Sequence, residues 1–495
     1  MRGQAFNPYL PQNEYIPDAE PYVFGNRVYI YGSHDRFGAP MFCMNDYVCY
    51  SAPVDDLSDW RYEGIIYHKN QDPKNKLGMR LLFAPDVAKA PDGKYYLYYA
   101  FDFMGIMGIA VSDRPQGPYE FYGHVHYKDG TVWGRKKGDS FPFDPGIFID
   151  DDRKVYLYSG FYTPVPGLVT GGKRRFEGGY VLELESDMMT IKTPEKLLFP
   201  KEGAGAFTGH EFFEASSMRK YNGKYYFVYS SKNNHELCYA VSDKPTEGFK
   251  FGGTLVSQGD LFLDENTDEK HAKNYLGNTH GSLLHLNDKY YIFYHRQTNR
   301  SSYARQACAE EIEMRPDGSF VQAEVTSCGL NGRPLEGLGR YEARIACNLW
   351  SKNGTGRYDG KNPRKQLAEH PYFTQDKKDG DATAVQYIAN MTDGAVAGFK
   401  YFDLQKIGSI LIEIRGNADG KMILSPDETF DKVLVEIRIS GAGNKWHLVS
   451  GKTQEMQMQE KHSSALFFKY SGKGAIDFKA FELRKETSYE KSSIN

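Results

Sequence analysis

Carboxylic acid residues recur in one local setting along this 495-residue chain. Each lies shortly before a segment rich in aromatic and β-branched residues, a composition typical of a β-strand. A proline adjoins three of them and restricts the backbone where the strand begins. The four residues are Asp18, Asp86, Asp144 and Glu214. Each aspartate taken singly also fits a turn residue, but the recurrence favours a common site.

Glu214 has the setting expected of a proton donor. It stands between Phe212–Phe213 and the small residues 215–217, and a carboxyl group desolvated among rings has a raised pKa. Hydrolysis of a glycosidic bond needs such a donor together with a base or a nucleophile at the anomeric carbon. A third carboxylate nearby keeps the donor protonated by charge repulsion. The set therefore favours glycoside hydrolysis, whereas Glu214 alone also fits a surface residue that enters a strand.

Two further glutamates compete for these roles. Glu20 follows Asp18 by two residues, and strand alternation places both side chains on one face. Glu211 precedes Glu214 by three residues and raises the same question. Spacing alone does not separate Asp18 from Glu20, whereas Glu214 has the motif's six-residue spacing to Lys220.

Five similar strand motifs must position these residues. A turn, a basic residue and a Val-Tyr or Tyr-Tyr pair recur every 60 to 70 residues, as in DGKYYLYY and NGKYYFVY. The basic residues of the five copies are Arg27, Lys94, Lys154, Lys224 and Lys289. Each period is long enough for one four-stranded blade, which predicts a five-bladed β-propeller over residues 1–330. The alternative is a β-sandwich with unrelated KYY strings.

The repeat is lost after a short Gly- and Pro-containing connector at residues 331–345. Residues 346–495 still alternate between apolar and polar side chains, as in GSILIEIRG and KVLVEIRIS. Polar turn clusters separate these runs. This pattern predicts a second all-β domain, a jelly-roll-like β-sandwich.

Composition restricts the partners of the protein. The net charge is −3 without a basic block, so nucleic acid is not an expected partner. No apolar run reaches the length of a membrane span, and the N-terminus lacks the apolar core of a signal peptide. The six cysteines are scattered, which favours free thiols. We therefore expect a cytoplasmic protein without a membrane partner.

The segments IPDAEPYVFGNRVYIYGSHD, FAPDV, FDPGIFIDDDRKVYLYSG, FFEASSMRK and GNTHGSLLHLNDKYYIFYHRQ resemble glycoside hydrolase family 43. The resemblance covers about residues 5–325 and implies a five-bladed propeller and inversion at the anomeric carbon. It implies that Asp18 is the general base, that Asp144 orients the donor and tunes its pKa, and that Glu214 is the general acid.

The same resemblance implies the substrate-binding residues, which are Phe83, Asp86, His280 and Arg305. Phe83 stands where many members have tryptophan, so an aromatic wall is retained. The chemistry needs no cofactor. A structural calcium ion near the propeller axis is implied beside His280, with contact through water because calcium prefers oxygen ligands. The alternative for His280 is a buried hydrogen-bonded side chain.

The C-terminal segments NMTDGAVAGFKYFDL and ALFFKYSGKGAIDFKAFELRK resemble a family 6 carbohydrate-binding module. Such modules stack aromatic rings on sugars, and Trp350, Tyr387 and Trp446 are the candidates. The alternative is a domain that only supports the propeller.

Together these features predict an exo-acting hydrolase that releases a terminal or side-chain pentose from xylan-derived oligosaccharides. The favoured sugar is α-L-arabinofuranose. β-D-xylosidase or dual activity is the first alternative, since the two sugars present similar hydroxyl patterns. A non-catalytic carbohydrate-binding propeller is the second.

Overall fold

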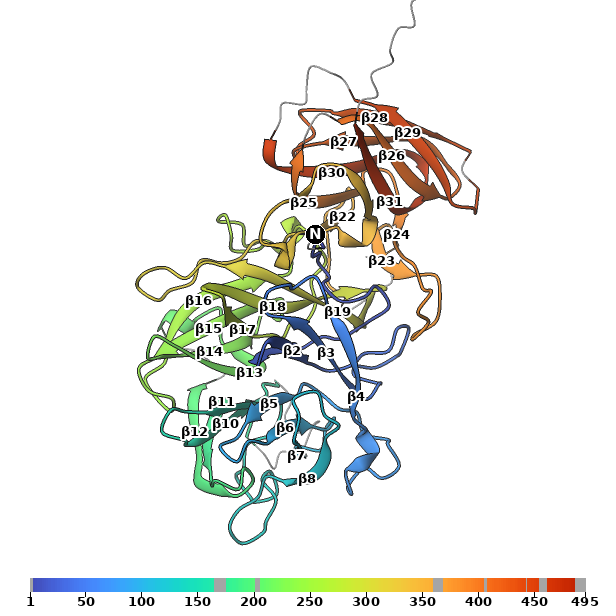
Figure 1. Ribbon diagram of the computed structural model, residues 1–495. Coiled ribbons are helices and arrows are strands. Elements are labelled where there is room, and N and C mark those ends of the chain that lie inside the picture. The colour runs from blue at the N-terminus through green and yellow to red at the C-terminus, as the bar shows by residue number, and fades with distance from the viewer. Residues whose placement is uncertain are drawn as a thin grey trace, which may run out of the picture.

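The computed structural model describes residues 3–163, 175–200, 205–358, 368–404, 407–441, 443–453 and 461–485. Strands dominate these residues, and the helices among them are short 3-10 turns (Figure 1). The predicted all-β class is confirmed. The 3-10 turns are η1 (Lys69–Gln71), η2 (Gly205–Phe207), η3 (Glu269–His271), η4 (Gly329–Asn331) and η5 (Ala343–Ile345).

The first two thirds of the chain form antiparallel sheets in which the strands pair in sequence order. Four of these sheets have four strands each. They are β1 (Glu20–Phe24), β2 (Arg27–Tyr31), β3 (Tyr47–Pro53) and β4 (Arg61–Tyr67); β5 (Asp86–Lys89), β6 (Tyr95–Ala100), β7 (Met107–Ser112) and β8 (Glu120–His124); β9 (Gly146–Ile149), β10 (Val155–Gly160), β11 (Gly178–Leu184) and β12 (Ile191–Pro200); and β13 (Phe212–Tyr221), β14 (Lys224–Ser231), β15 (Glu236–Ser242) and β16 (Lys250–Ser257).

The next sheet has three strands, β17 (Leu283–Leu286), β18 (Lys289–Thr298) and β19 (Ser301–Ile312). The N-terminal segment lies against its last strand. The Asn7 amide acts there like a strand backbone, since its Nδ2 donates to Ala309 O at 2.9 Å and its Oδ1 accepts from Ala309 N at 3.0 Å. The start of the chain is thereby tied to the sheet that ends the repeat.

The repeated motif forms the second strand of every one of these sheets: β2, β6, β10, β14 and β18. Its aromatic and β-branched side chains suit this place because a central strand packs on both faces, and β6 and β10 are buried along their whole length. The first strands of neighbouring sheets contact one another, β5 with β9, β9 with β13, and β1 with β17. The segments that carry the candidate carboxylates therefore converge.

The C-terminal region contains two six-stranded sheets. One consists of β20 (Leu335–Glu336), β22 (Asn348–Trp350), β25 (Val396–Leu404), β27 (Ala418–Ser425), β28 (Val435–Ser440) and β30 (Lys461–Gly474). The other consists of β21 (Gly339–Glu342), β23 (Tyr372–Gln375), β24 (Gln386–Met391), β26 (Ile407–Arg415), β29 (His447–Lys452) and β31 (Ile476–Lys485). The expected connector thus supplies β20 and β21, one strand to each sheet.

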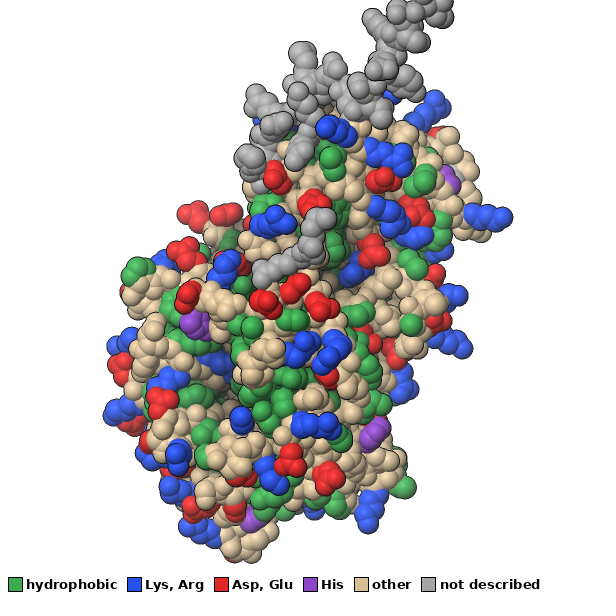
Figure 2. Space-filling model, in the orientation of Figure 1, with side chains coloured by type: hydrophobic (Ala, Val, Ile, Leu, Met, Phe, Trp, Pro, Cys, Tyr) green, Lys and Arg blue, Asp and Glu red, His purple; other side chains and the backbone are tan. Residues whose placement is uncertain are grey.

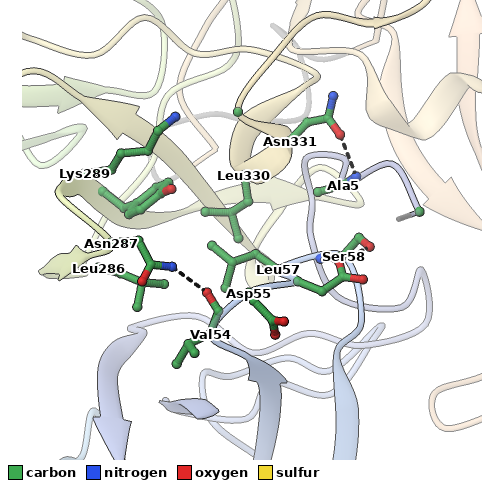
Figure 3. A pocket seen from close by; sticks show the side chains of 14 residues that line it. Ala5, Val54, Asp55, Leu57, Ser58, Leu286, Asn287, Lys289, Leu330 and Asn331 are labelled. Carbon is green, nitrogen blue, oxygen red and sulfur yellow. Dashed lines mark hydrogen bonds between the residues drawn. The ribbon is translucent and has the colours of Figure 1, made fainter. Parts of the chain in front are cut away.

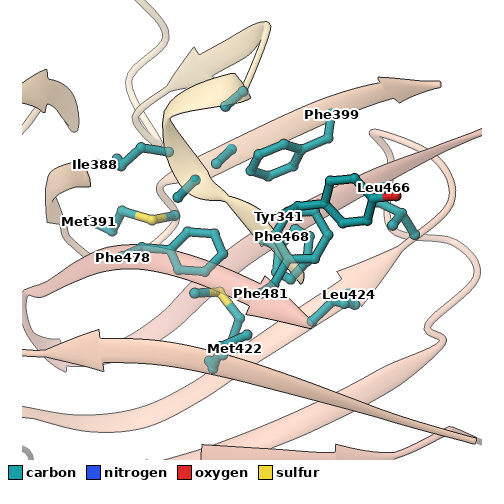
Figure 4. Packing of buried hydrophobic residues seen from close by; sticks show 14 of the residues in the cluster. Tyr341, Ile388, Met391, Phe399, Met422, Leu424, Leu466, Phe468, Phe478 and Phe481 are labelled. Atoms are coloured by element: carbon teal, nitrogen blue, oxygen red, sulfur yellow. The ribbon is translucent and has the colours of Figure 1, made fainter. Parts of the chain in front are cut away.

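These two sheets share one apolar core (Figure 4). Alternation in the sequence places it: Ile410, Ile412 and Ile414 on β26 are buried, while the residues between them are partly exposed. Phe481 on β31 lies 4.8 Å from Phe399 and 4.9 Å from Phe468, which belong to the opposite sheet. Rings from both sheets therefore interlock in the core.

On the face shown in Figure 2, basic and acidic side chains are interspersed over the described parts of both regions. No helix among the described residues has the length and apolarity needed to cross a membrane. The six cysteines are free, as predicted.

Candidate active site

One cavity of about 390 Å³ collects most of the candidate residues. This volume lies in the range of small-ligand sites. Its lining contains both aromatic rings and ionisable side chains. The lining residues come from all five repeat sheets or from the segments next to them. Its lining residues are Asp18, Met41, Phe42, Phe83, Ala84, Phe103, Phe141, Phe143, Asp144, Phe161, Phe213, Glu214, Asn234, Asn278, His280, Tyr303 and Arg305.

Asp18 lies two residues before β1 and has a φ of 60°, a left-handed conformation that is uncommon outside glycine. Its carboxylate accepts from Ser33 Oγ at 2.5 Å and from Arg305 Nη1 at 3.0 Å. Burial by itself raises the pKa of Asp18, but the Arg305 charge and the Ser33 hydrogen bond lower it below the ordinary value. Asp18 is therefore an ionised carboxylate at neutral pH.

Glu214 reaches the cavity through an irregularity in β13. The pairing register of β13 with β14 shifts on both sides of Glu214, and the next residue, Ala215, has a φ of 72°. A bulge of this kind re-aims a side chain, and the small residues of Ala215–Ser217 leave room for it. Burial and the charge of Asp18 raise the pKa of Glu214 to about 8. Glu214 therefore carries a proton at neutral pH.

Asp144 interacts with both of these carboxyl groups or their supports. Its Oδ2 accepts from Ala215 N at 3.1 Å, which ties it to the bulge beside Glu214. Burial and the charges of Glu214 and Asp18 raise its pKa well above the ordinary value. Asp144 thus connects the position and the protonation of the other two carboxyl groups.

His280 and Arg305 complete the polar part of the cavity. His280 Nδ1 lies 3.6 Å from Asp144 Oδ2, and burial lowers the pKa of the imidazole, so the ring is neutral at pH 7. The neighbouring Gly281 is required because a Cβ there would meet Phe293 O at 1.8 Å. Arg305 binds Asp18 and also pairs with the buried Asp35, whose Oδ2 lies 2.8 Å from Arg305 Nε.

Asp86, for which the family resemblance implies a substrate-binding role, is not among the residues that line this cavity. It is buried, and its carboxyl group accepts from Tyr22 OH at 2.6 Å, Val87 N at 2.7 Å and Ile147 N at 2.7 Å. Asp86 is the first residue of β5. Its hydrogen bonds to Tyr22 on β1 and Ile147 on β9 place its side chain between sheets. Phe83, three residues earlier, lines the cavity.

The competing glutamates are also outside the lining. Glu20 is buried in β1, and its Oε2 accepts from Arg219 Nη2 at 2.6 Å. Strand alternation did not apply to Asp18 and Glu20, because Asp18 precedes the strand and has a positive φ. Glu211 Oε2 pairs with Lys232 Nζ at 2.6 Å and accepts from Gly209 N at 3.1 Å. Of each pair, only the residue that the family resemblance favours, Asp18 or Glu214, lines the cavity.

Several lining residues were not anticipated. Phe42 and Phe103 lie in loops after the repeated strands, and Tyr303 lies near the start of β19; no sequence pattern marks these residues. Asn278 stands two residues before His280, so the motif GNTH contained a usable signal. Asp35 closes the first repeat in YIYGSHD, and its partner Arg305 lies 270 residues away. That pairing has no local sequence signal.

A second cavity of about 330 Å³ lies between the loop 54–58 and residues 286–291 (Figure 3). Its polar groups bind each other, since Asn287 Nδ2 donates to Val54 O at 2.8 Å and Ala5 N to Asn331 Oδ1 at 3.1 Å. Asp55 and Asp56 line it, but neither is buried. It lacks the paired acid and base of the first cavity.

A buried cavity that holds one ionised and one protonated carboxyl group is the arrangement of a glycoside hydrolase. The family model described as glycosyl hydrolases family 43 matches residues 7–320. A xylosidase/arabinosidase of Thermoclostridium stercorarium is 48% identical over 490 residues, which cover 98% of this chain and 99% of that protein. The chain belongs to glycosyl hydrolases family 43 and is a glycoside hydrolase.

Two solved structures place the fold. A β-xylosidase/α-arabinofuranosidase of this family from a compost metagenome, in complex with xylotriose and in a calcium-free form, is 26% identical with a TM-score of 0.50, and covers 65% of this chain and 98% of its own. An arabinoxylan arabinofuranohydrolase from Bacillus subtilis, in complex with cellotetraose, has a TM-score of 0.50 at 19% identity and covers 96% of both chains. The second similarity is one of fold and extends over the C-terminal sheets.

Proposed function

We propose that this enzyme releases single pentose units, with α-L-arabinofuranose as the preferred sugar, from the ends and side branches of xylan-derived oligosaccharides. The observation that carries the proposal is the coexistence of an ionised Asp18 and a protonated Glu214 in one cavity of about 390 Å³. A cavity of this size suits one sugar ring and part of the next. The relative that matches 98% of this chain is named xylosidase/arabinosidase, which supports the substrate class.

Each carboxyl group has one role in the proposed reaction. Asp18 takes a proton from water as the water attacks the anomeric carbon. Glu214 gives its proton to the leaving oxygen as the glycosidic bond breaks. Asp144 holds the bulge beside Glu214 through Ala215 N, and burial together with the charge of Asp18 keeps the acid protonated. The value of kcat/KM should therefore fall as the pH rises through about 8, where Glu214 loses its proton.

β-D-Xylosidase activity in the same cavity is the second candidate, and the name of the relative favours it as well. Turnover of an aryl α-L-arabinofuranoside and an aryl β-D-xyloside by one preparation decides between them. A higher kcat/KM on the arabinofuranoside supports the stated preference, and the reverse result assigns the xyloside. Binding without turnover of either would favour the non-catalytic alternative.

Inversion at the anomeric carbon is part of the proposal. It requires that Asp18 activates water instead of attacking the sugar. Proton NMR of the first-formed sugar should show the inverted anomer before mutarotation. A retained anomer or a trapped glycosyl-enzyme would make one of the carboxylates a nucleophile.

The sheets of residues 1–330 are proposed to be the blades of a five-bladed propeller, and those of residues 346–495 a jelly-roll-like sandwich. The contacts of β1 with β17, β5 with β9, and β9 with β13 support a ring of first strands around one axis. The shared core of the two C-terminal sheets supports the sandwich. A crystal structure with a different number of sheets around the axis would contradict this arrangement.

The C-terminal region is proposed to support the catalytic region without binding sugar itself. Trp350 lies on β22, in one sheet, whereas Tyr387 lies on β24 of the other sheet, beside Trp446. Arg415 packs 4.7 Å from the Tyr387 ring and 4.4 Å from the Trp446 ring, which covers the faces that a sugar needs. Retardation in a xylan-containing gel should be the same for the protein and its Trp446→Ala variant. A loss of retardation would favour the carbohydrate-binding module.

A structural calcium ion is proposed beside His280. Two buried atoms without a hydrogen-bond partner, His280 Nε2 and Glu20 Oε1, lie 4.0 Å apart. The carboxylate oxygen is a ligand of the kind calcium prefers, and the imidazole fits contact through bound water. Calcium should raise the thermal unfolding temperature by a few degrees relative to EGTA, since a ligand of the folded state stabilises it. If the unfolding temperature were the same in calcium and in EGTA, the proposed calcium site would hold water instead.

We place this reaction in the cytoplasm, where the substrates are imported oligosaccharides. Six free cysteines suit a reducing compartment. Cell fractionation tests the location. Short arabinose-substituted oligosaccharides should be better substrates than polymeric arabinoxylan, with free pentose as the first product. A ladder of internal cleavage products would contradict the exo-acting mode.

A further inference from the structure

The loop between β2 and β3 forms part of the cavity wall through Met41 and Phe42. Its inner side is attached to the catalytic region. Asp35 accepts from Cys43 N at 2.9 Å and pairs with Arg305, and the ring of Phe42 lies 4.8 Å from the Arg305 guanidinium. This attachment holds one edge of the loop.

The outer edge of the same loop is attached to the C-terminal region. Asp379 lies in the turn between β23 and β24, more than 330 residues away in sequence. Its Oδ1 accepts from Phe37 N at 2.7 Å, and its Oδ2 accepts from Asn45 Nδ2 at 3.1 Å. One carboxylate thus binds both arms of the loop that carries Met41 and Phe42. Hydrogen bonds to an ionised acceptor are the stronger ones.

The strands beside this turn also hold the second element of the wall. The turn between β18 and β19 donates from Asn299 N to Phe373 O at 2.7 Å, and the Arg300 guanidinium lies 4.0 Å from the Tyr372 ring. The strand that follows carries Tyr303 and Arg305 to the cavity. Tyr303 meets Phe42 edge to face at 4.6 Å. Residues 370–386 therefore contact both elements that join at this wall.

We propose that Asp379 is a positioning residue for the substrate-binding wall formed by Phe42 and Tyr303, so that the C-terminal region is part of the active-site scaffold. Asp379 touches neither substrate nor the three carboxyl groups and acts through the loop 37–45. Asp18 is held by Ser33 and Arg305, and Asp144 is held by Ala215 N, the residue that follows Glu214. Loss of Asp379 should therefore weaken substrate binding and leave the chemical step intact. The inference rests on this cavity being the proposed substrate site.

The test compares Asp379→Ala with Asp381→Ala. Asp381 lies in the same turn, but its carboxylate binds locally, accepting from Thr383 N at 2.8 Å and Thr383 Oγ1 at 2.6 Å. In Asp379→Ala, the KM for an aryl pentoside should rise about tenfold with kcat within about twofold, because the lost bonds are charge-assisted. Hydrogen exchange of residues 37–45 should become faster. Asp381→Ala should change neither KM nor this exchange.

A conservative variant guards against general loss of folding. Asp379→Asn keeps an oxygen that accepts from Phe37 N and should recover most of the KM and of the exchange protection. The inference is overturned if Asp379→Ala leaves KM and exchange unchanged, if Asp381→Ala changes them equally, or if kcat falls as much as KM rises. Hydrogen exchange needs no turnover, so it tests the anchor even if the proposed substrate is wrong.

Discussion

Two layers of buried charge lie where the first strands of the repeat sheets converge, and only one of them lines the cavity. The cavity layer holds Asp18, Asp144 and Glu214 with Arg305. The second layer, which we call the axial layer, holds Glu20 and Asp86 with Arg219. Both layers combine carboxyl groups from different sheets with one arginine.

The two layers differ in how far the protein satisfies the carboxyl oxygens. In the axial layer, three of the four oxygens accept hydrogen bonds, from Arg219 and Ser217 on Glu20 and from a tyrosine and two backbone amides on Asp86. In the cavity layer, the Glu214 carboxyl group has no hydrogen-bond partner among the described residues, and burial raises its pKa to about 8. Because no described residue binds the Glu214 carboxyl group, it is free to donate its proton to a bound substrate, whereas the hydrogen bonds of Glu20 and Asp86 hold those carboxyl groups in the structure.

The largest effect should come from the cavity layer. Glu214→Gln and Asp18→Asn should each lower kcat by about 10²–10⁴-fold, since a general acid or base contributes about that much. An activated aryl leaving group needs little protonation, so Glu214→Gln should be partly rescued on such a substrate, and Asp18→Asn should not. Steady-state kinetics on activated and natural substrates measure this. Equal losses on both substrates would undo the assignment of acid and base.

The matching change in the axial layer should affect stability instead. Glu20→Gln leaves the buried Arg219 guanidinium without its carboxylate, and breaking a buried ion pair costs about 3–5 kcal/mol of unfolding free energy. Urea denaturation measures this, and the folded fraction should keep kcat within about tenfold. If kcat fell as in Asp18→Asn while stability stayed unchanged, Glu20 would be the base.

A smaller effect should appear in the pH dependence of stability. Because the pKa of Glu214 is about 8 in the folded protein and near 4.5 when exposed, the folded state binds an extra proton between these values. This contribution to stability is fully present below about pH 4.5 and is lost as the pH rises through about 8. The free energy of unfolding of Glu214→Gln should therefore be about 1–2 kcal/mol higher than that of the wild type at pH 8 and above. Denaturation at pH 5 and pH 8 compares them, and an equal difference at both would contradict the raised pKa.

The smallest effect should come from Asp86→Asn. Burial and the charge of Glu20 raise the pKa of Asp86 well above the ordinary value, so asparagine resembles its neutral form. The exchange should cost about 1 kcal/mol of unfolding free energy, because one hydrogen bond to the backbone is weakened. KM and kcat should stay within about twofold. A large rise in KM would return Asp86 to the substrate site.

Much of the fold was predictable because it follows from local periodicity. The repeated basic-aromatic motif marks the second strand of each repeat sheet, and alternation on β26 marks its buried face. The three proposed catalytic residues were recognisable since each stands 9 or 10 residues before the basic residue of the next motif. Asp86 has a similar setting in the sequence, but it is the first residue of β5, whereas Asp18 and Asp144 precede their strands by two residues, and its side chain is buried between sheets.

The sequence by itself determined the strands, their order and the candidates for acid and base, since each depends on residues close together in the chain. Only the tertiary structure decided which carboxyl groups face the cavity. That choice depends on a positive φ at Asp18, on a bulge beside Glu214, and on partners as distant as Arg305. The contact of Asp379 with the loop 37–45 is of the same kind. Such partners meet only after folding has ordered the chain between them, so no local pattern announces them.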